Sequence, residues 1–125
     1  MKSSDYAIAT APDGLPIIAY SDNTNPVLRI AKCGNASCSF GNTLTIVDST
    51  ANVGENPSIT IGQDGFPVIA YSDGSGVNYD LKVAKCGNAS CSSGNTLTVI
   101  DSTAADVGYW SSIAIGSDGL PVIAY

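Results

Sequence analysis

One segment occurs three times in this chain, and this repetition limits the folds that the chain can adopt. The copies read YAIATAPDGLPIIAYSD at 6–22, SITIGQDGFPVIAYSD at 58–73 and SIAIGSDGLPVIAY at 112–125. Their Asp-Gly pairs lie 51 and then 54 residues apart. A strand-rich period near fifty residues is typical of arrays in which similar β-units stack on one another.

Each copy has the pattern of a β-hairpin. The Asp-Gly pair suits the turn, because glycine adopts positive φ without a clash and aspartate can bond its own backbone. Apolar residues alternate before the turn, as at Ile59 and Ile61, which places them on one face of a strand. The run after the turn (68–71 in the second copy) is apolar on both faces, as in a strand between two layers. No stretch has helical spacing over three turns, so the sequence predicts no helix.

A second block lies between the hairpins and is nearly the same in both of its copies. It reads VLRIAKCGNASCSFGNTLTIVDST at 27–50 and DLKVAKCGNASCSSGNTLTVIDST at 80–103. Its two ends predict two more strands, and the Gly, Asn and Ser cluster between them predicts a loop. One repeat is therefore four antiparallel strands. We expect units at about 5–50, about 57–103 and, as half a unit, about 110–125, all within a single domain over 1–125.

Four short strands in about 40–50 residues form the unit, or blade, of a β-propeller. The Asp-Gly hairpins favour antiparallel neighbours, whereas a β-solenoid needs shorter rungs and parallel stacking. The sequence therefore predicts an all-β fold, a β-propeller with about two and a half four-stranded antiparallel blades per chain. A β-sandwich is the alternative.

These motifs resemble the highly repetitive β-propeller repeats of secreted or surface proteins of bacteria. The resemblance is carried by DGFPVIAYSD at 64–73, LKVAKCGNASC at 81–91 and the Thr-rich strand that follows, and it covers nearly the whole chain. Alanine stands where that pattern has serine at Ala19, Ala70 and Ala124, which leaves the fold expectation intact. The resemblance implies blades and implies no particular activity, since such repeats carry no common one.

An incomplete array of blades leaves apolar surface uncovered. A blade buries both faces against its neighbours, and closed rings have about four to eight blades. An open arc of two and a half blades would expose apolar side chains at both ends and unpaired strand edges. We therefore expect copies of this chain to self-assemble into a closed ring, as a homo-oligomer. The alternatives are a fragment whose neighbouring blades were removed, or a last hairpin that rearranges.

The four cysteines form two closely spaced pairs, Cys33 with Cys38 and Cys86 with Cys91. A thiolate metal site would need four converging cysteines or a histidine, and the chain has no histidine. The equivalent loops of neighbouring blades diverge, so we expect one local disulfide per repeat and no metal. Disulfides predict an oxidising compartment, either secreted or at the cell surface. Residues 1–5 lack the apolar stretch of a signal peptide.

Charge and composition exclude several function classes. The net charge is −6, with five basic residues. Nucleic acids and anionic membrane surfaces need clustered Lys and Arg, so neither is expected as a partner. Without histidine there is no Ser-His-Asp or Cys-His nucleophile, and Arg29 is the only arginine, which excludes a sialidase-like arginine cluster. We expect no enzyme activity and no cofactor.

Aspartates recur at the strand ends, and we interpret them as structural. Catalysis needs one distinct pair of carboxylates, whereas these recur in every unit, so they are expected to bond turn backbone. They are Asp22, Asp48, Asp73 and Asp101. The segment DGSGVNYD at 73–80 lacks the spaced acids and the final glutamate of a calcium loop.

Two aromatic residues break the repeat. Tyr109 and Trp110 stand where the other return segment has Glu55 and Asn56. Aromatic rings on a loop can stack on sugars or fill a partner's pocket, so these two are the candidate ligand-binding residues; alternatively, Trp110 covers a seam between blades. The main functional expectation is a non-catalytic, self-assembling propeller module. The second is a multivalent lectin-like binder of carbohydrates or surfaces, and the third is a degenerate hydrolase propeller.

Overall fold

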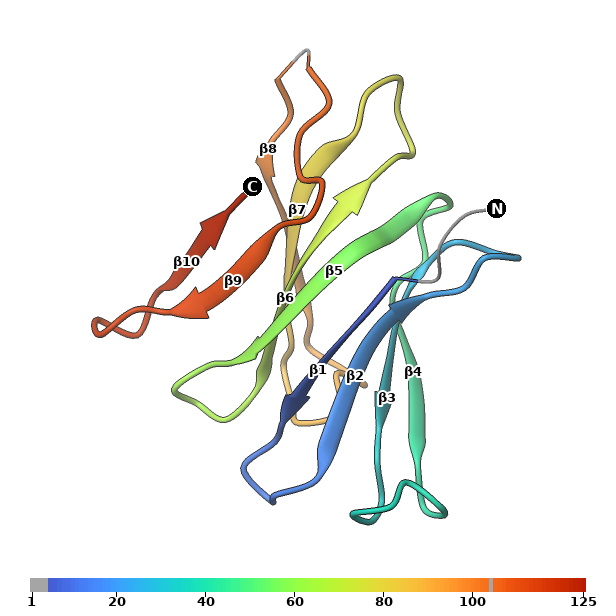
Figure 1. Ribbon diagram of the computed structural model, residues 1–125, viewed down its shortest axis with the longest axis vertical. Coiled ribbons are helices and arrows are strands. Elements are labelled where there is room, and N and C mark those ends of the chain that lie inside the picture. Colours follow the sequence, from blue (N-terminus) through green and yellow to red (C-terminus); the bar gives the residue numbers. More distant parts are fainter. Residues whose placement is uncertain (1–4, 104) are drawn as a thin grey trace.

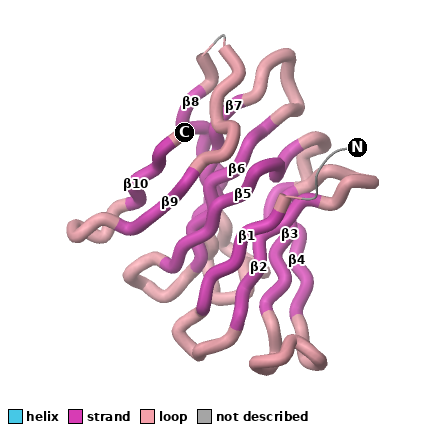
Figure 2. Tube along the Cα trace, in the orientation of Figure 1, coloured by secondary structure: helices cyan, strands magenta, loops and turns pink. Residues whose placement is uncertain are grey.

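The computed structural model describes residues 5–103 and 105–125, and every regular element in it is a strand (Figure 1). The first four strands are β1 (Tyr6–Thr10), β2 (Pro16–Ser21), β3 (Leu28–Lys32) and β4 (Thr43–Asp48). The next four are β5 (Val53–Ile61), β6 (Pro67–Asp73), β7 (Asp80–Lys85) and β8 (Thr96–Asp101). The last two are β9 (Ser112–Ile115) and β10 (Pro121–Ala124). Figure 2 shows strands and loops and no helix in the described part, which confirms the predicted all-β class.

The strands form three antiparallel sheets that follow the order of the chain. Sheet I is β1-β2-β3-β4, sheet II is β5-β6-β7-β8, and sheet III is the pair β9-β10. The predicted four-stranded units are therefore confirmed. Sheet II starts earlier than predicted, because β5 extends back to Val53 through a bulge at which the register shifts around Glu55.

The Asp-Gly turns close the three hairpins as predicted. Their glycines have φ values of 78°, 82° and 81° (Gly14, Gly65 and Gly119), a conformation that glycine adopts without strain. In each turn the aspartate Oδ1 accepts a hydrogen bond of 3.0 Å from the backbone N–H two residues later (Asp13, Asp64 and Asp118). The second strand of each hairpin then begins at a proline.

The sheets lie side by side along the chain and do not form a closed ring (Figure 1). Strand β5 contacts β1 and β2 of sheet I and also β9 of sheet III. The propeller predicted from the sequence is therefore not shown: the sheets of one chain are not arranged as a propeller, because two and a half sheets do not surround an axis. No described segment is a helix long and apolar enough to cross a membrane.

Two apolar clusters lie between the sheets rather than within them. The cluster between sheets I and II is the larger, and it includes Ile17, Ile30, Val47, Ile69 and Tyr71. The cluster between sheets II and III includes Val68, Ala70, Leu81, Val83 and Ile113. Successive residues of β6 point to opposite faces and serve both clusters, so the whole strand is buried, as predicted for a strand between layers.

Glycines permit the close crossing from one sheet to the next. Gly54 has φ 87°, and a Cβ there would lie 2.7 Å from Leu28 Cα. Gly108 repeats the arrangement, with φ 82° and a Cβ position 2.9 Å from Leu81 Cα. A side chain at either position would push the return segment away from the sheet that it has just left.

Candidate functional site

A buried group of charged and polar side chains joins sheet I to sheet II. Asp48, at the end of β4, accepts hydrogen bonds from Tyr71 Oη and Lys82 Nζ, both at 2.8 Å. Lys82 Nζ also lies 3.2 Å from the carboxylate of Asp73, at the end of β6. Asp48 is only 2% exposed. These four residues are termed the inter-sheet latch.

The latch is fully ionised at neutral pH apart from its tyrosine. Burial acts to raise the pKa of Asp48, but the hydrogen bonds from Lys82, Thr50 and Tyr71 together outweigh it, and the pKa is lowered. The pKa of Asp73 is also lowered, because hydrogen bonds from Ser75 and Lys82 outweigh burial. The two carboxylates raise the pKa of Lys82 despite its desolvation. Burial and the nearby Asp48 raise the pKa of Tyr71, so this hydroxyl stays a donor.

The chemistry of the latch is structural. Its charged groups are paired with one another, since Lys82 bridges the carboxylates of Asp48 and Asp73. Leaving one charge of such a buried pair without its partner costs about 3–5 kcal/mol, so the latch fixes which residues of the two sheets meet. No group of three or more His, Cys, Asp or Glu side chains in the described part of the chain could hold a metal ion.

The repeated aspartates bond turn backbone as predicted, and two of them also belong to the latch. Each accepts a hydrogen bond from the backbone N–H two residues later, at 2.9–3.0 Å (Asp22, Asp48, Asp73 and Asp101). The reasoning from sequence missed the second role of Asp48 and Asp73. A signal was present, because each full repeat places a tyrosine two positions before its first strand-end aspartate and a basic residue 19 positions before its second.

The same residue types recur between sheets II and III and on the outer face of sheet I, with fewer partners. Beside sheet III, Tyr125 Oη donates to Asp101 Oδ2 at 2.9 Å, and no basic side chain joins this pair among the described residues. On sheet I, Arg29 lies 3.9 Å from Asp22, and Arg29 Nε is buried without a hydrogen-bond partner in the described structure. Tyr20 occupies the position on β2 that Tyr71 occupies on β6.

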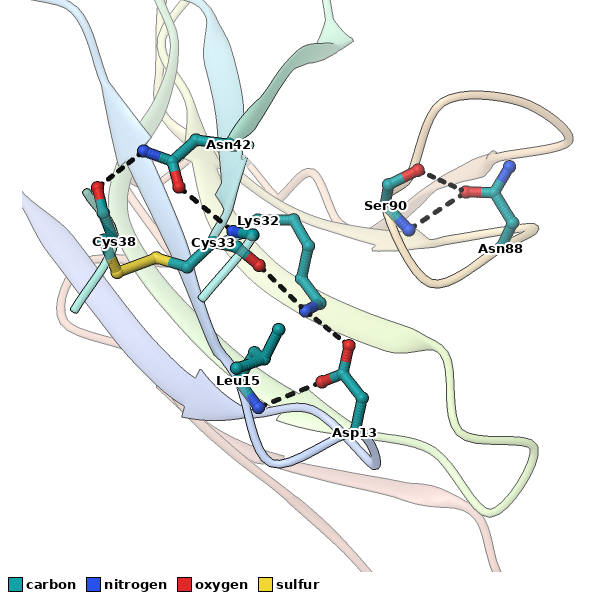
Figure 3. Close-up of polar contacts among 9 residues, drawn as sticks. Asp13, Leu15, Lys32, Cys33, Cys38, Asn42, Asn88 and Ser90 are labelled. Atoms are coloured by element: carbon teal, nitrogen blue, oxygen red, sulfur yellow. Dashed lines mark hydrogen bonds and ion pairs between the residues drawn. A yellow bond between two sulfur atoms is a disulfide. The ribbon is translucent and has the colours of Figure 1, made fainter. Parts of the chain in front are cut away.

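Both predicted disulfides are present. The bridges are Cys33–Cys38 and Cys86–Cys91. An asparagine ties the first loop further, since Asn42 Nδ2 donates to Cys38 O at 2.7 Å and Asn42 Oδ1 accepts from Gly34 N at 3.0 Å (Figure 3). The second bridge is part of the core between sheets I and II, a packing role that its loop position did not predict. The bridges indicate an oxidising environment.

In sheets I and II a lysine ties the hairpin turn to the third strand of the sheet. Lys32 Nζ donates to Asp13 Oδ2 at 2.8 Å and to the backbone oxygen of Cys33 at 3.3 Å (Figure 3). Lys85 repeats the ion pair with Asp64 at 2.7 Å. The hydrogen bonds from these lysines lower the pKa of both aspartates. Because both aspartates are exposed, these pairs add little stability. Figure 3 also shows a local turn bond in which the Asn88 side chain accepts from the Ser90 backbone N–H, at 3.1 Å.

The predicted ligand-binding residues lie together in the segment between β8 and β9. The Tyr109 ring is 4.7 Å from the ring of Tyr79 and 5.9 Å from that of Trp110, between centroids. These three residues are termed the aromatic cluster; Tyr79 was not predicted to belong to it. Burial and a hydrogen bond with Tyr79 raise the pKa of Tyr109 to about 12.

Trp110 is held in an unusual conformation. It is 83% exposed, so it covers no seam within the chain. Its φ is 49°, a left-handed conformation that is strained for a bulky side chain. The equivalent Asn56 has φ 48°, and asparagine tolerates this region well. The repeat therefore places a tryptophan where the backbone favours a smaller residue.

Two apolar clefts lie beside sheet III. One of about 440 Å³ lies between it and sheet II and is lined by Val68, Val83, Ile115 and Leu120, among others. The other, of about 470 Å³, is lined by residues of β10 and by Val83 and Ile100 of sheet II. Both clefts arise because sheet III has only two strands and does not cover the whole face of the four-stranded sheet II.

No protein-family model matches the chain, and neither a curated protein nor a solved structure matches it. The function is therefore inferred from the geometry.

Proposed function

We propose that this chain is a non-catalytic β-propeller module whose outer sheets pack on further blades, and that copies of it associate into a closed ring. The observation that supports this proposal is the contact between sheets I and II. It joins one repeat to the next through the latch and an apolar cluster. The residues that make this contact are repeated on the outer faces.

Apolar side chains on the outer faces favour association. On β1, Tyr6 and Ile8 are exposed, and on β10 so is Val122; Ile100 is also exposed, on the face of sheet II that the β9–β10 hairpin covers only in part. Large apolar side chains gathered on an exposed face are typical of interaction sites. Sheets that are packed on both faces would bury it, as sheets I and II bury their shared face. The two disulfides support a secreted or cell-surface location for such a ring.

The size of the ring follows from the number of complete sheets. Each copy supplies two four-stranded sheets. Rings of about four, six or eight sheets would then contain two, three or four copies. The expected native mass is two, three or four times 12.7 kDa.

The test is native mass spectrometry together with light scattering between about 1 and 100 µM, a range in which specific protein contacts form. We expect one discrete assembly at the upper end of the range. A single copy at every concentration would overturn the proposal.

Glycan binding is a second candidate function, and the strained, exposed Trp110 favours it. Strain at a non-glycine residue is retained where the surroundings hold it, often at a ligand site. The rings of the aromatic cluster could stack on a sugar face. Because Trp110 is the only tryptophan, its fluorescence reports on this site alone.

The test of glycan binding is fluorescence titration with a glycan panel. We expect a saturable change with at least one glycan, and calorimetric titration of that glycan should show no binding to Trp110→Ala, which has no tryptophan fluorescence of its own. The matched control is Phe40→Ala, since Phe40 is another exposed aromatic residue on a loop and lies outside the aromatic cluster. Unchanged fluorescence across the whole panel would argue against a lectin.

A further inference from the structure

We propose that the β9–β10 hairpin is a displaceable cap on sheet II, and that sheet I of a second copy replaces it. In the assembled state, Tyr20 and Arg29 of that second copy would bind Asp101. This inference rests on the proposed association of copies, and it names the surfaces that meet.

The capped face of sheet II matches the face of sheet I that packs on sheet II. The four residues at its centre, Val68, Ala70, Leu81 and Val83, occupy the repeat positions of Ile17, Ala19, Leu28 and Ile30. The first set contacts the hairpin, and all four members of the second set belong to the cluster shared with sheet II. A surface that fits the second set therefore also fits the first.

The outer face of sheet I carries the complementary surface. It presents Ile18 and Tyr20, which occupy the positions of Ile69 and Tyr71 on the face of sheet II that meets sheet I. Ile69 and Tyr71 are fully buried in that contact. Sheet I of a second copy can therefore pack on the capped face of sheet II in the same way that sheet II packs on sheet I within one chain.

The hairpin covers this face only in part. Val47 on β4 is 8% exposed beneath sheet II, whereas the equivalent Ile100 on β8 is 48% exposed. Ile100 borders the cleft of about 470 Å³ beside β10, together with Ile123 and Tyr125. Among the described strands, β10 pairs only with β9. A four-stranded sheet on this face would cover the apolar side chains that the hairpin leaves exposed.

Charge complementarity identifies the same partner. Asp48 receives side-chain hydrogen bonds from Tyr71 and from the basic Lys82, whereas Asp101 receives one from Tyr125 and pairs with no basic side chain among the described residues. Arg29 occupies the position of Lys82, and its Nε is buried without a hydrogen-bond partner in the described structure. A guanidinium pairs well with a carboxylate, since it can donate two parallel hydrogen bonds.

Of the two hairpins β1–β2 and β9–β10, the β9–β10 hairpin would lose fewer interactions if it were displaced. The β1–β2 hairpin pairs along its edge with β3 and also contacts β5. The β9–β10 hairpin has no third strand in the described structure. When it leaves, Tyr20 of the incoming copy can replace Tyr125 as the donor to Asp101. The hairpin and sheet I of a second copy therefore compete for the same face of sheet II.

The test is the dissociation constant of the full chain, measured by analytical ultracentrifugation for the wild type and for variants. We expect Asp101→Asn and Arg29→Gln each to weaken association about tenfold, and the double variant to weaken it no more than the worse single change, because both remove the same interaction. Tyr125→Phe should strengthen association about threefold, since it loosens only the cap. The control Asp13→Asn removes a charge at an exposed turn and should change little.

Circular dichroism checks that each variant folds. Arg29→Lys introduces the residue that sheet II has at this position, so it should fold and keep association within about threefold of the wild type. If the two single losses of affinity multiplied to about a hundredfold in the double variant, the two residues would act independently and the cap proposal would be wrong. Weaker association of Tyr125→Phe would also contradict it. Neither result would contradict the proposed ring. A wild-type chain that remains a single copy would overturn both.

Discussion

The contacts of sheet II with sheet I and with sheet III are built from repeated residues, but the two neighbouring sheets differ in size. Toward sheet I, Tyr71 is fully buried and donates to a buried Asp48. Toward sheet III, the equivalent Tyr125 is 58% exposed and donates to the more accessible Asp101. The number of strands on the neighbouring sheet, and not the repeat sequence, therefore decides how deeply these residues are buried. Most of the stabilisation should come from the contact between sheets I and II.

The largest expected difference in stability is between substitutions at two equivalent isoleucines, Ile69 and Ile18. Ile69 is fully buried between sheets I and II, so Ile69→Ala should lower the free energy of unfolding by about 3–4 kcal/mol, from lost transfer and a cavity. The equivalent Ile18 is half-buried on the outer face, so Ile18→Ala should cost about 1 kcal/mol. Urea unfolding below the concentration of association measures both. Equal losses would contradict the comparison.

A smaller difference is expected for the two aspartates. Asp48→Asn leaves Lys82 with one carboxylate in a buried site and should cost about 3 kcal/mol. Asp101→Asn in the separated chain should have an effect close to the measurement error, because its hydrogen bond with Tyr125 is exposed. The readout is again urea unfolding of the separated chain. An Asp101 effect as large as that of Asp48 would mean that the cap is as firmly held as a full sheet.

The pH dependence of stability should show the smallest difference. The folded pKa values of Asp48 and Asp73 lie below the ordinary 3.8, so their contribution is complete above that value and is lost as the pH falls through the folded pKa. The pKa of Lys82 is raised above 10.5, so its contribution is complete below that value and is lost as the pH rises through the folded pKa. Stability should therefore be level between about pH 5 and 9 as far as the latch contributes.

The Asp48→Asn variant measures how much of the pH dependence of stability comes from the latch. Unfolding midpoints measured between about pH 2 and 7 should fall less steeply in the variant than in the wild type, because one of the groups that must be protonated is gone. Identical slopes would mean that Asp48 has a similar pKa in the folded and unfolded chain.

The parts of the fold that depend on local sequence could be predicted. The Asp-Gly pairs fix the hairpins, a proline marks the start of each second strand, and the cysteines pair within one loop. The bulge in β5 was missed, because the register shift around Glu55 depends on pairing with β6. The propeller and its ring stay predictions, since they concern sheets beyond one chain.

The latch could not be predicted from any single strand. Its partners lie 23 and 34 positions apart in different repeats, so only the packing of two sheets brings them together. Lys82 alternates with Leu81 and Val83, which by pattern alone suggests a side chain facing solvent. That face is covered by sheet I. The aromatic cluster was predicted in part, because the contact of Tyr79 with Tyr109 needs two loops to meet.

The short span of each disulfide has a consequence for how such arrays change in evolution. The bonded cysteines are five positions apart, and the stretches 31–45 and 84–98 around them differ at one residue. Each cysteine is therefore closer along the chain to its own partner than to the equivalent cysteine of the neighbouring repeat, which disfavours wrong pairing during oxidation. Unequal recombination can then insert or delete a whole repeat together with its own bridge. Lengthening or shortening the array leaves no thiol behind.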